Sequence, residues 1–291
     1  MPFRRYSHEI GLTAVVLIWG ANFSVLKGLF AVFHPYVANA LRLSLALGSL
    51  ALLLVFLLPT FGGAARTAIR TNGWKIAGLG LFGFFLYQVA FVEGLARTSP
   101  TSAALLMATA PLWTALSAHL TRIERLTAAA WGALLVSVAG AGLVVAGART
   151  ATDAVPDTLA GNLIILGAAL CWGLFTTLSR PLTQSTNAAL LSVLEMIVAL
   201  PLLLLVALPL LPDVDWSLVD GGVLAALVFS GTLSSGITFV IWNRAVRHVG
   251  PTSTIAFANA VPLAAAAFGY LLLGTPVTLL QVGGGLCIIG G

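Results

Sequence analysis

Aromatic and neutral polar side chains interrupt the middle of several long apolar runs. Asparagine and glutamine in such surroundings need hydrogen-bond partners or water, and tyrosine and tryptophan usually favour the ends of a membrane-spanning run. Their presence at mid-run predicts a cavity with aromatic walls and a few neutral polar groups, as small-molecule sites have. The candidate cavity residues are Trp19, Asn22, Tyr87, Gln88, Met107, Trp113, Trp172, Phe175, Thr238 and Asn259. Packing of the rings and hydrogen bonds of the amides between helices are the alternative interpretation.

Four of the charged residues within the apolar runs or directly beside them are candidates for buried ion pairs: Arg42, Glu93, Glu195 and Arg244. A charged side chain at mid-bilayer costs about 2.5–3.5 kcal/mol on insertion scales, so such residues are functional candidates. We expect Arg42 to pair with Glu93 and Glu195 to pair with Arg244, because each pair would offset the cost of burial. Static links between helices, gates, and a proton-coupling carboxylate remain open as roles. No charge stands among the candidate cavity residues, which argues against strongly anionic cargo.

Pro111 and Pro262 stand in the middle of two apolar runs, 151 positions apart. Each removes one backbone hydrogen bond and bends its helix. Their equivalent placement suggests a pair of hinges or a site lined by freed carbonyls, and a static kink is the plainer alternative.

Sequence motifs for common catalytic chemistry are absent. There is no G-x-x-x-x-G-K-[ST] phosphate loop, no G-x-S-x-G turn and no H-E-x-x-H pair, so neither direct use of ATP nor serine or zinc hydrolysis is indicated. The two cysteines, Cys171 and Cys287, form no metal-binding spacing. We therefore expect no enzyme activity, no cofactor and no metal.

The composition places all these residues in a membrane. Of 291 residues, 59% are hydrophobic and 8% are charged, against about 45–50% and 25% in soluble domains. So little charge cannot cover a water-facing surface, which excludes a soluble enzyme, a disordered chain and a nucleic-acid binder. The expected surroundings are a lipid bilayer.

Ten stretches are long or nearly long enough to span it as helices. They cover 10–33, 35–58, 75–96, 101–121, 127–148, 161–180, 188–211, 219–243, 252–273 and 277–291. Continuous apolar runs without alternation exclude a membrane barrel, so the expected fold class is an all-α membrane protein. The last stretch is short, and we expect a native C-terminal tail to be missing from the sequence.

Basic residues set the expected orientation. Most Lys and Arg fall in the loops on one side of these ten spans, and five aspartates gather on the other side. Since basic loops stay in the cytoplasm, we expect a protein of the cytoplasmic (inner) membrane with both termini inside.

The two halves of the chain resemble each other. Pro100-Thr101 and Pro111-Leu112 recur 151 positions later, and Trp19-Gly20 and Leu41 recur 153 positions later. Residues 1–150 and 151–291 thus form two copies of a five-helix unit. Because five is odd, the second copy must enter the membrane upside down, giving ten transmembrane helices as an inverted 5+5 repeat. Inverted repeats are a recurring architecture of secondary transporters.

Several motifs carry a family resemblance: Trp19-Gly20-x-Asn22-Phe23, Arg42, the run from Leu95 to Ala104, Pro111-Leu112-Trp113, and Glu124-Arg125-Leu126-Thr127. The chain resembles the EamA-type family of the drug/metabolite transporter superfamily over nearly its whole length. The resemblance implies ten helices in a 5+5 repeat and export of small metabolites, and it is nearest to exporters of aromatic and other neutral amino acids. Thr275-Pro276 stands where the second repeat of that family often has an acidic residue.

The function that we expect is secondary or facilitative export of small amphipathic metabolites, chiefly neutral and aromatic amino acids, by alternating access. Efflux of lipophilic or cationic drugs, a membrane-embedded enzyme and a passive channel are the alternatives. Small residues at heptad spacing (Ala133, Gly140 and Gly147, with Gly283 and Gly290) mark a close helix contact within the chain or a homodimer seam between the fifth and tenth helices.

Overall fold

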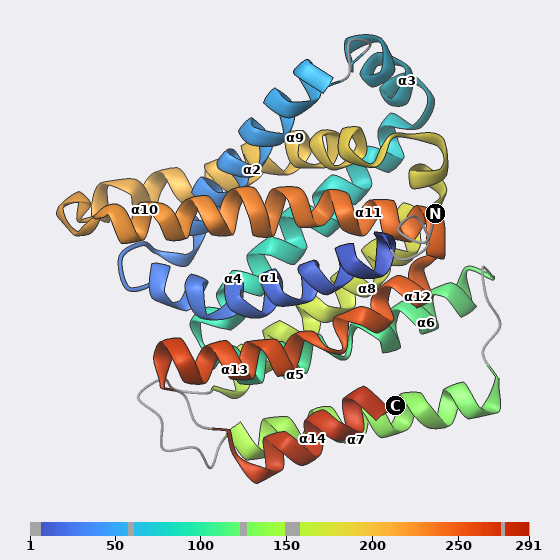
Figure 1. Ribbon diagram of the computed structural model, residues 1–291, viewed down its shortest axis with the longest axis vertical. Coiled ribbons are helices and arrows are strands. Elements are labelled where there is room, and N and C mark those ends of the chain that lie inside the picture. Colours follow the sequence, from blue (N-terminus) through green and yellow to red (C-terminus); the bar gives the residue numbers. More distant parts are fainter. Residues whose placement is uncertain (1–6, 58–60, 123–126, 149–157, 275–276, 291) are drawn as a thin grey trace.

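The computed structural model describes residues 7–57, 61–122, 127–148, 158–274 and 277–290, and every regular element in these ranges is helical (Figure 1). The first half contains α1 (Ser7–Leu29), α2 (Pro35–Leu57), α3 (Phe61–Leu79), the π-helix η2 (Gly80–Leu86), α4 (Tyr87–Ala96), α5 (Pro100–Met107), α6 (Ala110–Leu120) and α7 (Ala128–Ala148). The second half contains α8 (Leu159–Ser185), α9 (Ala188–Ala207), the 3-10 turns η3 (Leu208–Asp213) and η4 (Trp216–Leu218), α10 (Gly221–Val228), the π-helix η5 (Phe229–Ile237), α11 (Thr238–Val249), α12 (Pro251–Ala258), α13 (Val261–Leu273) and α14 (Leu279–Gly290).

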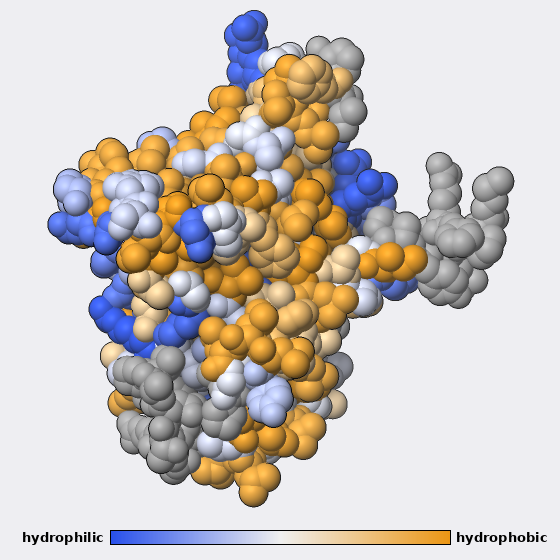
Figure 2. Space-filling view, turned by 60° about the vertical axis from the view of Figure 1, so that its left-hand side comes forward, coloured by the Kyte–Doolittle hydropathy of each residue, from blue (hydrophilic) through white to orange (hydrophobic). Residues whose placement is uncertain are grey.

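Seven helical stretches of the described residues are long and apolar enough to cross a membrane: Glu9–Leu29, Pro35–Phe56, Phe61–Ala96, Pro100–Leu120, Leu159–Ser185, Ala188–Asp213 and Gly221–Val249. Three shorter apolar helices, Trp131–Val144, Val261–Leu273 and Leu279–Gly290, fall on the remaining expected spans. Apolar side chains also cover much of the surface seen in Figure 2. The prediction of an all-helical multi-pass membrane protein is confirmed, and the total of ten spans stays a prediction.

The third span begins earlier than the sequence predicts. We expected it at 75–96, but the helical stretch runs over Phe61–Ala96 and bends at Asn72, where φ is −134° and ψ is 20°. Arg66 and Arg70 lie four residues apart in the added part, and both are exposed. A helix with a charged face of this kind suits the membrane–water interface, and a search for continuous apolar runs does not detect it.

Both central prolines stand where a helix restarts. α5 ends at Met107 and Pro111 lies in the first turn of α6, and Pro262 lies in the first turn of α13. The missing N–H of proline costs no hydrogen bond in a first turn. The predicted interruption is therefore present as a break between two helices rather than a kink in one, and movement about it stays a prediction.

Two π-helical segments occupy corresponding places in the two halves. η2 leads directly into α4, and η5 leads directly into α11. Short π-helical stretches are uncommon and frequently mark functional sites. The turn after η2 carries Tyr87 and Gln88, and η5 itself carries Ser234, so both segments set the direction of side chains described below.

Helices from the two halves interleave through glycines. α1 packs on α13, and α8 packs on α6. A Cβ atom added to Gly20 would lie 2.4 Å from the Cβ of Ala264, and one added to Gly173 would lie 2.6 Å from the Cβ of Trp113. Only glycine permits these two approaches without moving a helix.

The π-helical segments make a second set of close contacts with helices of the opposite half. η2 packs on α9 and η5 packs on α2. A Cβ added to Gly80 would lie 2.7 Å from the carbonyl oxygen of Glu195, and one added to Gly231 would lie 2.8 Å from that of Arg42. Each π-helix is thus held closely against a helix from the other half.

α7 and α14 lie side by side at one end of the molecule (Figure 1). A Cβ on Gly140 would lie 2.6 Å from the carbonyl oxygen of Gly284, and one on Gly284 would lie 2.6 Å from that of Gly140. On α7 the predicted small-residue face serves this contact through Gly140. On α14 the contacting residue is Gly284, and the predicted Gly283 and Gly290 have open space where a Cβ would be placed. A homodimer through these two helices stays a prediction and would have to use their outer faces.

Candidate substrate cavity

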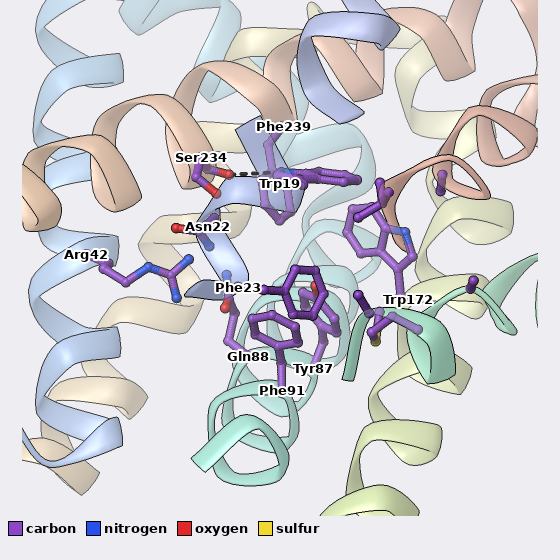
Figure 3. A pocket seen from close by; sticks show the side chains of 15 residues that line it. Trp19, Asn22, Phe23, Arg42, Tyr87, Gln88, Phe91, Trp172, Ser234 and Phe239 are labelled. Atoms are coloured by element: carbon purple, nitrogen blue, oxygen red, sulfur yellow. Dashed lines mark hydrogen bonds between the residues drawn. The ribbon is translucent and has the colours of Figure 1, made fainter. Parts of the chain in front are cut away.

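Aromatic rings from four helices form the wall of a cavity at the centre of the bundle (Figure 3). The ring centroid of Trp172, on α8, lies 5.4 Å from that of Trp19 on α1 and 5.2 Å from that of Tyr87 on α4. Phe239, on α11, lies 5.4 Å from Trp172 in an edge-to-face arrangement. Such rings offer a rigid apolar surface and an electron-rich face to a ligand.

Trp19 joins helices of the two halves by hydrogen bonds. Its Nε1–H donates to the carbonyl oxygen of Ser234, 3.1 Å away, and to the hydroxyl of Thr238, 2.9 Å away. The indole N–H is therefore satisfied without a ligand, and the ring is fixed in place. Trp19 can form the cavity wall as a preorganised surface.

Polar side chains gather at one end of the cavity. Figure 3 shows Asn22, Arg42 and Gln88 directed toward one another from α1, α2 and α4. All three are buried, with 3–4% of their surface exposed. The Oδ1 of Asn22 accepts a hydrogen bond of 2.6 Å from the hydroxyl of Ser230. The amide of Gln88 has no hydrogen bond to a protein group that the structure records.

The cavity encloses about 600 Å³ of space between its walls, its open side included. The enclosed volume of the cavity itself is about 60 Å³, below the range of about 300–1,000 Å³ typical of small-molecule sites. Its lining residues are Trp19, Asn22, Phe23, Arg42, Tyr87, Gln88, Phe91, Ala104, Met107, Ala108, Trp172, Ser234, Phe239, Ala258 and Val261. These residues come from both halves of the chain, and some of them lie at the breaks between α5 and α6 and between α12 and α13.

Six of the ten candidate residues line this cavity: Trp19, Asn22, Tyr87, Gln88, Met107 and Trp172. The other four lie outside its lining. Phe175 is fully buried and stacks on Trp172 with a centroid distance of 5.2 Å, and Thr238 accepts the bond from Trp19. Trp113 is half-buried where α6 meets Gly173, and Asn259 is half-buried at the break after α12.

Sequence reasoning missed three aromatic residues of the wall. Phe23 and Phe91 lie one helical turn after Trp19 and Tyr87, and their rings meet at 5.3 Å. Residues four apart share a helix face, so this spacing could have identified both. Phe239 follows Thr238 directly, and no sequence signal separates it from an ordinary core residue.

The two expected ion pairs are not formed. Glu93 pairs with Arg97, four residues later on the same helix. Glu195 is fully buried with no hydrogen-bond partner at either carboxylate oxygen, and Arg244 is exposed on α11. The pairing was wrong because correspondence between repeats does not bring residues together, and a partner one turn away is nearer for Glu93.

Arg42 bonds to neutral groups instead of to Glu93. Its Nη1 donates to the Oδ1 of Asn39 at 3.2 Å, and its Nη2 donates to the hydroxyl of Ser235 at 2.6 Å. Because Arg42 lines the cavity, the expectation that the cavity carries no charge is also wrong. The error came from judging Arg42 only as a member of an ion pair.

Comparison with known proteins identifies the kind of protein that this cavity belongs to. The model of the EamA-like transporter family matches residues 8–146 and again residues 159–291. The chain belongs to the EamA-like transporter family. The family resemblance drawn from the sequence is confirmed, and the family is one of transporters.

Relatives align with this chain over most of their length. The uncharacterized transporter YyaM of Bacillus subtilis (strain 168) is 27% identical over 282 residues, which cover 97% of this chain and 91% of that protein. The "Probable terminal-alkyne amino-acid exporter" of Streptantibioticus cattleyicolor is 32% identical over 221 residues, covering 74% of this chain and 70% of that protein. A solved crystal structure with 17% identity superposes with a TM-score of 0.65 over 98% of this chain and 94% of its own, which indicates a shared fold.

Proposed function

We propose that this protein exports small amphipathic metabolites, chiefly neutral and aromatic amino acids, across the cytoplasmic membrane by alternating access. Ten membrane helices would form an inverted 5+5 repeat with both termini in the cytoplasm. The substrate would occupy the central cavity, with its apolar part against Trp19, Tyr87 and Trp172. The observation that carries the proposal is that this aromatic and polar cavity is built jointly by helices of the two halves.

Mirrored contacts support the inverted repeat. Gly20 on Ala264 and Gly173 on Trp113 are the same contact with the halves exchanged, because Gly173 lies 153 positions after Gly20 and Ala264 lies 151 positions after Trp113. The contacts of Gly80 and Gly231 exchange in the same way. Two near-equivalent halves can give two near-equivalent states, one open to each side. The two separate family matches are consistent with this division.

The proposal that the cargo is an amino acid rests on the lining of the cavity and on the name of one relative. Aromatic walls on one side and amide groups on the other suit a molecule with an apolar part and a polar part. The relative from Streptantibioticus cattleyicolor is named as an amino-acid exporter. Neither a lipid substrate nor direct coupling to ATP is needed to account for the site.

Counterflow in proteoliposomes tests the proposal. Vesicles containing the purified protein are loaded with unlabelled phenylalanine, and entry of labelled phenylalanine is followed. A carrier gives saturable uptake that rises transiently above equilibrium, whereas a passive channel gives uptake that neither saturates nor overshoots.

A matched pair of tryptophan variants places the flux in this cavity. Trp172→Ala should lower counterflow by at least about 10-fold, since it removes one wall of the site. Trp216→Ala is the control, because Trp216 is 55% exposed on η4 and does not line the cavity. Equal flux in both variants would place transport elsewhere, and uptake of a lipophilic cation without amino-acid uptake would favour drug efflux.

A further inference from the structure

Arg42 is a buried cation whose hydrogen bonding is incomplete. It is 3% exposed, and its Nε has no hydrogen-bond partner. Its two recorded bonds go to Asn39 and Ser235, which are neutral. A guanidinium has five N–H donors, and burying it in a membrane without an anion is costly. Within the described ranges, the recorded ion pair is that of Glu93 with Arg97, so no carboxylate of those residues balances Arg42.

The unbalanced charge borders the cavity at the end opposite Trp172. Figure 3 shows the guanidinium reaching from α2 toward Asn22 and Gln88, with the rings of Trp19, Tyr87 and Trp172 farther along the cavity. A ligand with an anionic end and an apolar end would therefore match both ends of the site. Arginine is well suited to this role because its planar donors match the two oxygens of a carboxylate.

We propose that Arg42 binds the carboxylate of the transported amino acid and so makes that group a requirement for transport. The inference rests on the proposed function and adds the recognition residue to it. The side chain of the substrate lies against the aromatic wall, and the amides of Asn22 and Gln88 offer oxygens to its ammonium group. Lipophilic amines that lack a carboxylate leave Arg42 unbalanced and are poor substrates.

The corresponding position of the other half supports one-sided recognition. Glu195 stands where the second repeat matches Arg42, but it is fully buried and is not among the residues that line the cavity. The charge at the site therefore comes from the first half alone. The substrate accordingly binds in one orientation, with its carboxylate toward α2.

Competition in the counterflow assay tests the inference with the wild-type protein. The competitors are phenylalanine, its carboxamide phenylalaninamide, and 2-phenylethylamine, which share one aromatic side chain. Losing a hydrogen-bonded charge pair should raise the inhibition constant by at least about 10-fold. Phenylalanine should therefore compete at least about 10-fold more strongly than either analogue. Equal competition by all three would overturn the role of Arg42 and leave the proposed transport function standing.

Variants identify the residue that distinguishes the compounds. Arg42→Gln should raise the KM for phenylalanine toward the wild-type value for phenylalaninamide while leaving the KM for the amide within about 3-fold, and Arg42→Lys should fall between them. Arg70→Gln, on the exposed part of α3, is the control. An equal change of both KM values in Arg42→Gln would mean a structural role. If Arg42→Gln does not fold, the wild-type competition decides alone, and absence of any flux would reject the proposed function and the inference with it.

Discussion

Replacing Gly20 by alanine should force two helices of opposite halves apart. The added Cβ would lie 2.4 Å from the Cβ of Ala264 and 3.0 Å from two backbone atoms of α13. Ordinary contact between such atoms begins near 3.4 Å, so α1 and α13 must separate by about 1 Å. Gly173→Ala should likewise force α8 away from α6, because its Cβ would lie 2.6 Å from the Cβ of Trp113 and 2.8 Å from the carbonyl oxygen of Ala110.

Neither obstacle is the flexible end of a long side chain, so the strain must be taken up by the backbone. Overpacking of this kind costs about 1–3 kcal/mol per site. Each variant should therefore lower the midpoint of thermal unfolding by roughly 3–10 °C. The two costs should be similar, since the two contacts are similar in geometry.

The assay is thermal unfolding of the purified protein in detergent, followed by tryptophan fluorescence. Each variant has a control on the same helix: Gly28 on α1 and Gly167 on α8 have open space where a Cβ would be placed. Gly28→Ala and Gly167→Ala should unfold at or slightly above the wild-type temperature, because alanine favours helix. If Gly20→Ala and Gly173→Ala unfold like their controls, the close approach of the two halves described above is refuted.

Lys27, which is half-buried, and Glu195, which is fully buried, give further predictions. Lys27→Met should lower the free energy of unfolding by about 2–4 kcal/mol, because the Nζ of Lys27 donates to the carbonyl oxygens of Leu95, Ala96 and Thr98 at 2.8–3.0 Å, at the end of α4. The control is Lys75→Met, at an exposed position. Equal melting temperatures of the two variants would contradict this role of Lys27. Glu195→Gln should leave the melting temperature at neutral pH unchanged or raise it, because neither carboxylate oxygen has a hydrogen-bond partner and an uncharged amide removes any cost of burying a charge. A fall of more than a few degrees would show that Glu195 has a stabilising partner.

The apolar runs were sufficient to predict an all-helical membrane protein and much of the lining of the cavity. Apolar runs are found by summing the hydrophobicity of single residues over a window. The candidate aromatic and amide residues can be recognised because they interrupt these runs. Six of those ten residues line one cavity because mid-run positions of different helices lie at a similar depth. The first part of α3 was missed because its polarity follows one helix face rather than a run.

The contacts between helices could not be predicted in the same way. Glu93 had a nearer partner in Arg97, and Arg42 faces a cavity whose position depends on how α1, α2 and α4 pack. The π-helical segments depend on the close fit of Gly80 and Gly231 against the opposite half. Such features arise from packing at the level of ångströms, which one sequence does not reveal.

Two-sided accessibility of position 107 tests the central claim most directly. Met107 lines the cavity and is half-buried, so a Met107→Cys variant in which Cys171 and Cys287 are replaced by alanine would place one thiol in the proposed path. In sealed vesicles of known orientation, a membrane-impermeant thiol reagent should label it from either side, and phenylalanine should slow labelling from both. Labelling from one side only, or at a rate that phenylalanine does not change, would contradict alternating access through this cavity.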